Sequence, residues 1–324
     1  MNFFLKTILK TVAVITATVF FLPNLAAEPY AFISNQLDNN VSVIDTQTQK
    51  VVKSITVKGK PVGVAANNHK SEVYISTPEG NGFAVLDSKQ LKQTGVVSTS
   101  NGALGIAVDK TGQLVFIADW YENRVSIFDT DTFKLVKVIV VGKSPSGMVV
   151  SPDNQWLYVA NRVSNSISLI NLDTLATRRT VDVGTHPFGI TVDAKGKRLY
   201  TANVESDDVT VVKIDQLNKL ATFTVPVQSR PYAVSLALKD TRLFVTNQDD
   251  SSVSVIDTQT LKEIAVIEVG EKPEGIATHP DDRHIYIANW FDGTVTIIDG
   301  KLLKVVNTVS VGEGSRAFGE FFTQ

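Results

Sequence analysis

Hydrophobic and polar positions alternate in short runs along this chain, and the runs recur at a fixed spacing. The clearest run is an aromatic or aliphatic stretch that ends in a small residue and a short polar residue. It occurs seven times at intervals of 42 residues, except for one interval of 44 between Asn203 and Asn247. The seven copies are Phe32-Ile33-Ser34-Asn35, Tyr74-Ile75-Ser76-Thr77, Phe116-Ile117-Ala118-Asp119, Tyr158-Val159-Ala160-Asn161, Tyr200-Thr201-Ala202-Asn203, Phe244-Val245-Thr246-Asn247 and Tyr286-Ile287-Ala288-Asn289. A period near 40 residues with strand-like content indicates a circular or stacked array of one repeated unit.

The sixth repeat shows what one unit encodes. Turn signals come about every ten residues, and the segments between them are short and rich in β-branched residues, which predicts four antiparallel strands. The expected strands are Leu243 to Asn247, Val253 to Asp257, Ile264 to Val269 and Ile276 to Thr278, with a turn at Asp257 to Thr260 and a crossing loop at Gly270 to Gly275. Such a unit is one blade of a β-propeller.

The two ends of the repeat array predict how the ring closes. The array starts at the second strand of a unit, Tyr30 to Asn35, and ends on an innermost strand, Gly319 to Thr323. We therefore expect an all-β, seven-bladed propeller of four-stranded antiparallel blades, in which the C-terminal strand completes the first blade. Closure of this kind protects strand edges that would otherwise pair between molecules.

The N-terminal residues differ from the repeats and resemble a secretory signal peptide. Lys6 and Lys10 precede an apolar stretch from Thr11 to Leu22, which is followed by Pro23 and the small pair Ala26-Ala27. The stretch is shorter than the roughly 20 residues that a membrane span needs. We expect a signal peptide over residues 1–27 and a propeller over residues 28–324, exported to the periplasm or secreted, with no membrane insertion after cleavage. An uncleaved anchor is the alternative.

Charge and cysteine content limit which classes of partner, cross-link and metal site the chain can have. Removal of residues 1–27 would leave 29 basic and 33 acidic residues, so the net charge gives no general attraction to nucleic acid or anionic membrane. Cysteine is absent, which excludes disulfides and thiolate metal sites. The rigidity of an exported monomer must then come from packing and ring closure.

The repeats resemble the YVTN family of β-propeller repeats. The resemblance rests on Tyr158-Val159-Ala160-Asn161 and Phe244-Val245-Thr246-Asn247, with Val-Ser-Val-Ile-Asp and Gly-x-x-Pro-x-Gly segments beside them, and it covers residues 30–324. An exported chain of seven such repeats is similar to the bacterial periplasmic YncE-like proteins. The resemblance implies the fold. Related propellers include lactonases and subunits of redox enzymes, and nucleic-acid binding has been proposed within the YncE-like group, so the fold does not choose a function.

Residues that suit catalysis are few. His69, His279 and His284 are expected on one face and His186 on the other, which argues against a histidine metal site. The recurring carboxylates Asp45, Asp87, Asp129, Asp257 and Asp299 are better explained as turn residues, because they repeat with the unit. No glycine-rich phosphate loop or nucleophile elbow occurs. We expect no catalytic residue, no metal and no cofactor.

The repeats place one group of cations and aromatic rings together. The crossing loops and the hairpin loops after each Asn should lie at the same mouth of the central channel. The candidate ligand-binding residues there are Lys60, Trp120, Tyr121, Arg162, His186, Phe188, Arg230, Tyr232, Lys272, Trp290, Phe291, Arg316 and Phe318. Cations beside flat apolar faces suit anionic ligands with rings, such as nucleotides, single-stranded nucleic acid or acidic glycans. The alternative is that the crossing-loop aromatics plug the channel and the cations are solvated.

Acidic residues of the same hairpin loops limit the size of that ligand. We expect them to form an outer negative rim made of Glu79, Glu122, Glu205, Asp207, Asp208, Asp249, Asp250 and Asp292. A basic centre within an acidic rim favours a narrow ligand, or a protein partner with a basic edge, over a long polyanion.

The sequence thus favours a non-catalytic binding or scaffold propeller that engages a ligand, including single-stranded nucleic acid as a candidate, or a protein partner. The runner-up is a lactonase-like or other metal-dependent hydrolase that uses the same cavity. A third hypothesis is that the chain is an accessory protein of an exported oxidoreductase.

Overall fold

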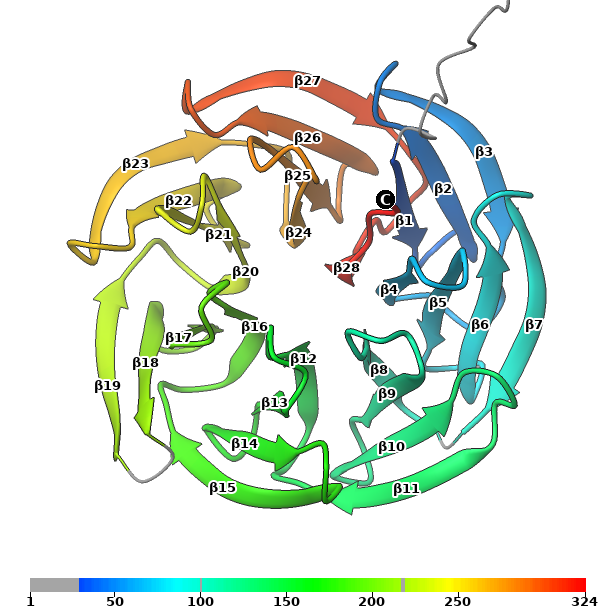
Figure 1. Cartoon of the computed structure of the whole chain (residues 1–324). Coiled ribbons are helices and arrows are strands. Elements are labelled where there is room, and N and C mark those ends of the chain that lie inside the picture. The colour runs from blue at the N-terminus through cyan, green and yellow to red at the C-terminus, as the bar shows by residue number, and fades with distance from the viewer. Residues whose placement is uncertain (1–28, 100, 217–218) are drawn as a thin grey trace, which may run out of the picture.

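Seven blades surround a central channel in the computed structural model, which describes residues 29–99, 101–216 and 219–324. Figure 1 shows the blades arranged in a ring, with the C-terminus beside the first blade. The predicted seven-bladed propeller is therefore confirmed. The expected signal peptide, residues 1–27, lies outside the described residues. Within the described part of the chain, no helix has the length and apolar character needed to cross a membrane.

Each blade is built from strands at four distances from the channel. The inner strands are β4 (Gly63–Asn67), β8 (Ala103–Val108), β12 (Pro145–Val150), β16 (Pro187–Val192), β20 (Pro231–Ala237), β24 (Pro273–Thr278) and β28 (Phe318–Glu320). The second strands are β1 (Tyr30–Asn35), β5 (Glu72–Thr77), β9 (Leu114–Asp119), β13 (Trp156–Asn161), β17 (Arg198–Asn203), β21 (Arg242–Asn247) and β25 (His284–Asn289). The third strands are β2 (Asn40–Asp45), β6 (Gly82–Asp87), β10 (Arg124–Asp129), β14 (Ser166–Asn171), β18 (Asp208–Gln216), β22 (Ser252–Asp257) and β26 (Thr294–Asp299). The outer strands are β3 (Lys50–Thr56), β7 (Lys92–Ser98), β11 (Leu135–Val140), β15 (Ala176–Asp182), β19 (Lys219–Pro226), β23 (Lys262–Glu268) and β27 (Lys304–Ser310).

The repeated sequence motif corresponds to the second strand. All seven copies end one of these strands at its last residue, and their aromatic and aliphatic side chains pack between blades. The inner strands approach one another so closely that side chains would collide. A Cβ built on Gly275 would lie 1.8 Å from the carbonyl oxygen of Arg316, and one on Gly105 would lie 1.9 Å from that of Ser146. Glycine at this place in the crossing motif is therefore required by packing between neighbouring blades.

The C-terminal segment closes the ring, as predicted. It runs antiparallel to β1, with bridges between Ala31 and Phe322 and between Asn35 and Ser315. The backbone amide of Phe32 donates to the carbonyl of Phe321 at 2.9 Å. Between these contacts, β28 pairs in parallel with β4 of the second blade. The closing segment therefore joins two blades, because its middle residues turn from the edge of β1 to the edge of β4.

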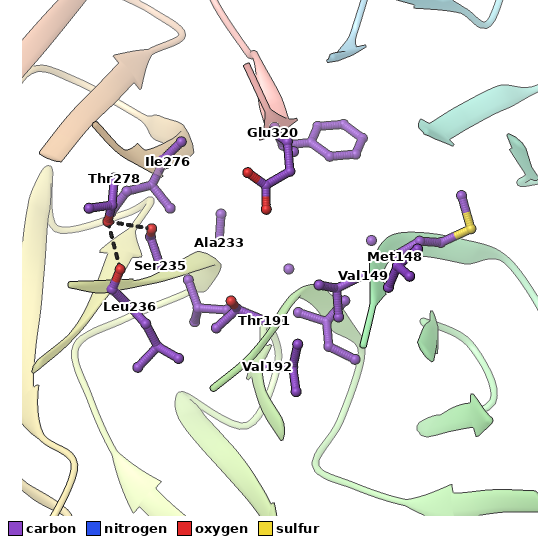
Figure 2. A pocket seen from close by; sticks show the side chains of 18 of the residues that line it. Met148, Val149, Thr191, Val192, Ala233, Ser235, Leu236, Ile276, Thr278 and Glu320 are labelled. Carbon is purple, nitrogen blue, oxygen red and sulfur yellow. Dashed lines mark hydrogen bonds between the residues drawn. The ribbon is translucent and has the colours of Figure 1, made fainter. Parts of the chain in front are cut away.

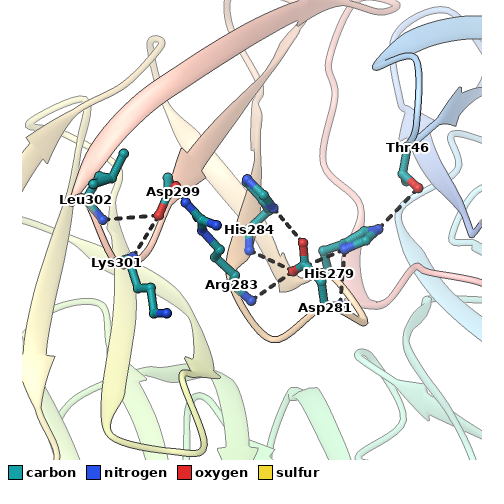
Figure 3. Close-up of polar contacts among 8 residues, drawn as sticks. All are labelled: Thr46, His279, Asp281, Arg283, His284, Asp299, Lys301 and Leu302. Atoms are coloured by element: carbon teal, nitrogen blue, oxygen red, sulfur yellow. Dashed lines mark hydrogen bonds and ion pairs between the residues drawn. The ribbon is translucent and has the colours of Figure 1, made fainter.

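A polar cluster on the turn side of the ring strengthens this closure (Figure 3). His279, which follows β24, places Nε2 3.2 Å from Oγ1 of Thr46 in the first blade. Its ring packs edge-on against Phe322 with centroids 5.4 Å apart. The Asp281 carboxylate lies 2.6 Å from Nδ1 of His284 and 3.2 Å from Nδ1 of His279. The last blade, the first blade and the C-terminal segment thus meet at one histidine.

Asp281 should make this closure sensitive to acid. Burial opposes ionisation of Asp281, but hydrogen bonds from the backbone and side chain of His284 and from the Arg283 backbone outweigh it and lower its pKa to about 2. A carboxyl with a depressed folded-state pKa stabilises the fold above its ordinary pKa, and that contribution is lost as pH falls toward 2. We expect the free energy of unfolding to fall less steeply between pH 4 and pH 2 in Asp281→Asn than in the wild type, as measured by denaturant titration. The exposed Asp173→Asn is the matched control, and an unchanged acid slope in Asp281→Asn would contradict the assignment.

Candidate functional site

The crossing loops and the hairpin loops meet at one mouth of the channel, as the repeats predict. Backbone amides of the hairpins donate to crossing-loop carbonyls in successive blades. Trp120 donates to Gly102 at 3.0 Å, Arg162 to Ser144 at 3.0 Å, and Trp290 to Lys272 at 2.9 Å. Candidate residues that are far apart in sequence are therefore held on one face by the backbone itself.

A strained turn directs the crossing-loop residues. The residue before the loop proline has a positive φ angle at Lys60, Ser144, His186, Arg230 and Lys272. Left-handed backbone is uncommon for residues other than glycine and persists where surrounding contacts fix it. Here the fixing contact comes from the preceding blade. The Asn39 side chain accepts from the Lys60 amide at 3.0 Å, and the same contact occurs at Ser144, His186 and Arg230.

Three of the candidate aromatics close the channel instead of facing solvent. Phe188, Tyr232 and Phe318 are 2%, 8% and 6% exposed and pack with Val62. The ring centroids of Phe188 and Tyr232 lie 4.0 Å apart, and those of Phe188 and Phe318 lie 5.3 Å apart. These side chains form a plug across the channel, in agreement with the alternative stated above. A ligand could reach only its outer surface.

Two adjoining cavities lie above this plug. The larger, here called the mouth cavity, has a volume of 840 Å³ and is lined by Gln36, Pro78, Glu79, Asn81, Asn101, Gly102, Leu104, Trp120, Tyr121, Arg162, Phe188, Arg230, Tyr232, Gln248 and Arg316. The smaller, the side cavity, has a volume of 460 Å³ and is lined by Gln36, Arg230, Gln248, Asp249, Lys272, Glu274, Trp290, Phe291 and Arg316. The larger volume is within the usual range for small-molecule sites.

Most of the candidate residues line one of these two cavities. Trp120 and Tyr121 lie in the mouth cavity, while Trp290 and Phe291 lie in the side cavity, so the two aromatic pairs do not share a wall. Lys60, His186 and Phe318 line neither cavity. Lys60 and His186 remain in crossing loops of this face, and Phe318 lies beneath the surface in the plug.

Acidic side chains of the hairpin loops form ion pairs with the cations of the mouth. Glu205 lies 3.3 Å from Arg230, 4.0 Å from Arg162 and 3.9 Å from His186. Asp249 lies 2.6 Å from Lys272 and 3.7 Å from Arg230. The carboxylates of Glu205 and Asp249, which the sequence places in the hairpin loops, therefore contact the cations of the mouth directly. The guanidinium of Arg162 also lies over the Trp120 ring, 5.7 Å from its centroid.

A buried polar network connects three blades, the sixth, the seventh and the first, at the base of the mouth. Arg316, on the closing segment, forms an ion pair with Glu274 at 2.5 Å and donates to the Tyr232 hydroxyl at 2.6 Å. It also donates to Gln36 at 3.2 Å, and Gln248 donates to Glu274 at 2.7 Å. The side chains of Arg316 and Glu274 are only 16% and 8% exposed. Arg316 is thus the central contact of the site and of the ring closure together.

Burial perturbs the ionisable groups of this network. It raises the pKa of Glu274 more than the neighbouring Arg316 lowers it. Burial also raises the pKa of Tyr232, although Arg316 opposes that effect. The phenol therefore stays protonated and donates or accepts hydrogen bonds as a neutral group at neutral pH.

Sequence reasoning missed Gln36 and Gln248. Both occupy the position directly after the last residue of a second strand, which is also the position of Trp120, Arg162 and Trp290. A comparison of this single position across the repeats would have found them. Glu274 was placed in a crossing loop by its sequence, but its pairing with Arg316 depends on how the last and first blades meet.

The recurring carboxylates that were expected to be turn residues occupy turns in the structure. Asp45, Asp87, Asp129, Asp257 and Asp299 each accept hydrogen bonds from backbone amides two or three residues later, which confirms their role in turns. In the described part of the chain, His, Cys, Asp and Glu side chains form no group of three that could hold a metal ion.

The fold and the site define a closed seven-bladed propeller with a ligand-sized cavity over a plugged channel. The model of the family described as "Cytochrome D1 heme domain" matches residues 24–151 and 204–317, more than half of the chain, and the chain belongs to this family. The model described as "Lactonase, 7-bladed beta-propeller" matches residues 134–236. No curated protein matches the chain.

Solved structures with the same fold have low sequence identity to this chain. The hydrazine synthase of Kuenenia stuttgartiensis is 18% identical, with a TM-score of 0.76 over 83% of this chain and 91% of that one. A functionally unknown protein from Desulfotomaculum acetoxidans is 14% identical, with a TM-score of 0.77 over 90% and 99%. A protein from Lactobacillus plantarum is 16% identical, with a TM-score of 0.78 over 89% and 97%. At this level of identity, the likeness concerns the fold alone.

The family name implies a haem, and a haem held through its iron in the mouth cavity would need an iron ligand there. Haem iron is held by His, Cys, Met or Tyr. The lining of the mouth cavity contains no His, Cys or Met. Its tyrosines are Tyr121, which is 71% exposed, and Tyr232, which is buried and bonded to Arg316. His186 lies beside Glu205 and outside the lining. The lining of the mouth cavity therefore does not fit an iron-ligated haem.

Proposed function

We propose that this chain is an exported, YVTN-type propeller, similar to the YncE-like proteins, that binds a small anionic ligand with a planar ring at the mouth cavity and does not transform it. We place it in the periplasm or outside the cell, after cleavage of a signal peptide, as a monomer. The observation that carries the proposal is the mouth cavity itself, whose lining combines Trp120 and Tyr121 with Arg230 and Arg316.

The pairing of charges supports a small ligand over a long polyanion. Arg162 and Arg230 share Glu205, so their guanidiniums are held in position and part of their charge is neutralised. A long single strand gains its affinity from many unpaired cations, and that affinity falls strongly with salt. A single base or similar ring can gain from stacking on Trp120 and from one or two directed hydrogen bonds. A protein partner at this mouth is the other outcome that the test below distinguishes.

Tryptophan fluorescence can test the proposal, because Trp120 lies in the mouth cavity and Trp156 starts β13 at the far end of its blade. In a Trp156→Phe background, we expect a nucleoside monophosphate to quench the remaining emission with saturation. Loss of stacking usually costs about 1–3 kcal/mol per ring, so Trp120→Ala should weaken binding about tenfold or more. Trp290→Phe is the matched control, since Trp290 lies in the side cavity.

Three outcomes separate the candidates. Saturable quenching that is weakened about tenfold or more in Trp120→Ala and retained in Trp290→Phe supports the small-ligand proposal. Tighter, strongly salt-dependent binding of an eight-nucleotide single strand would favour nucleic acid instead. The absence of a response to either probe would contradict the proposal. The hypothesis of a protein partner would then be the next one to test.

A lactonase-like or other hydrolase is the second candidate, because the lactonase model matches residues 134–236 and because Glu274 is a buried carboxyl with a raised pKa. A hydrolase of this kind should open simple lactones and lose that activity in Glu274→Gln. If it depends on a metal, a chelator should both inhibit it and lower its melting temperature. Absence of turnover with a lactone panel would remove this candidate.

A further inference from the structure

The channel below the plug contains a third cavity, separate from the mouth cavity and the side cavity. It has a volume of 320 Å³ and is formed by the inner strands of six blades, with Phe318 as the wall that it shares with the plug. The turns after these strands, which contribute Lys110, Pro152, Ala194 and Asp240, also line it, so it opens toward the opposite face of the ring. We call it the channel cavity. Its volume is at the low end for small-molecule sites, with room for about ten water molecules.

One carboxylate projects into this cavity. Figure 2 shows the Glu320 side chain, from the end of β28, with its carboxylate directed into the space between the inner strands. Within the described residues, Glu320 has neither an ion pair nor a side-chain hydrogen bond. The lining around it includes the aliphatic side chains of Val149, Val192 and Ile276. The side chain is exposed in the open channel, so its carboxylate can pair with a cationic ligand that enters there.

The other polar groups of the lining also offer acceptors. Thr278 donates its hydroxyl proton to the carbonyl of Leu236 at 2.8 Å, so Ser235, 2.8 Å from the same Thr278 hydroxyl, must donate to it (Figure 2). A hydroxyl that has used its proton presents only lone pairs. Ser235 therefore accepts hydrogen bonds from the cavity. Asp240 is already bonded to the Ala194 amide at 2.7 Å, and Lys110 provides the single positive charge of the lining.

From this lining we propose that the channel cavity binds a short aliphatic primary amine in its ammonium form. An ammonium group has three donors and no acceptor, which matches Glu320 and Ser235. The methylene chain would lie along Val149, Val192 and Ile276. Anions are disfavoured because the Glu320 carboxylate would repel them. Neutral polyols are disfavoured because they would leave the charge of Glu320 unpaired. The ligand enters from the face opposite the mouth, so this site is independent of the function proposed above.

Isothermal titration calorimetry with 1,4-diaminobutane at pH 7 tests the proposal on the full propeller. We expect saturable one-site binding, no binding of 1,4-butanediol, and at least a tenfold loss of affinity in Glu320→Gln. Glu313→Gln is the matched control, since Glu313 is an exposed carboxylate of the same C-terminal segment that does not line the cavity. A second variant, Val192→Phe, keeps Glu320 and fills the cavity, and it should also abolish binding.

The proposal is overturned if the wild type binds no diamine at millimolar concentration. It is equally overturned if Glu320→Gln, with a wild-type melting temperature, binds as tightly as the wild type, or if the diol binds as well as the diamine. Failure here leaves nucleotide quenching at Trp120 unaffected, because the plug separates the two cavities.

Discussion

Deletion of Phe318 to Gln324 is expected to give a protein that aggregates instead of folding as a soluble monomer. The deleted segment contains Phe318, Phe321 and Phe322, which are 6%, 0% and 8% exposed. Burial of one such side chain contributes about 1.5–3 kcal/mol. The three together approach the whole net stability of an ordinary domain, about 5–15 kcal/mol.

The deletion also uncovers strand edges. The closing segment covers β1 on one side and β4 on the other, so its loss leaves both edges unpaired and available to other molecules. Size-exclusion chromatography with light scattering and thermal melting measure the effect. Removal of Gln324 alone, which is exposed, is the control and should behave as wild type. A truncated protein that stays monomeric and melts cooperatively near the wild-type temperature would rule out this account of closure.

Replacement of Arg316 by Met is expected to cost about 3–5 kcal/mol, because it leaves Glu274 buried without its partner. The same change at Arg230, whose side chain is 36% exposed, should cost about 0–1 kcal/mol, since partly exposed ion pairs contribute little. The double variant with Arg316→Met and Glu274→Met should recover much of the loss, because both polar groups are then gone. Denaturant unfolding of all four proteins gives the comparison.

The pH dependence provides an independent check on Arg316. Burial already raises the pKa of Glu274, and removal of the guanidinium removes the group that opposes this rise. A carboxyl whose folded-state pKa lies above its unfolded value binds more protons in the folded state, so stability falls as pH rises between the two values. Arg316→Met should therefore be most stable in mild acid and should lose stability as pH rises above about 4, the ordinary range for Glu. Equal losses at all pH values would show that Glu274 is not the cause.

The sequence predicted which side chains lie at the mouth better than it predicted which partners they contact. Side chains such as Trp120 and Arg162 could be placed at the mouth, because their positions in the repeat fix their place on the ring. The partners of these side chains could not be predicted. Glu205 reaches Arg230 from the neighbouring blade, and Gln36 reaches Arg316 across the closure, contacts that depend on side-chain direction and blade spacing.

The plug illustrates the same limit. The repeats place Phe188, Tyr232 and Phe318 at equivalent positions after the crossing loops, but equivalence does not say whether a ring faces solvent or its neighbours. In the structure, the three rings fill the channel, because seven inner strands leave space at the axis that large side chains from a few blades can occupy.

The sequence by itself determined the number of blades, their strands, the turn residues and the closure by the C-terminus, because each is a local pattern repeated with one period. Only the tertiary structure decided which charges are paired, where the channel is blocked, and that the mouth cavity and the channel cavity lie on opposite sides of the plug. These features arise from side chains of different blades that converge on the axis, and contacts of that kind leave no periodic trace in the chain.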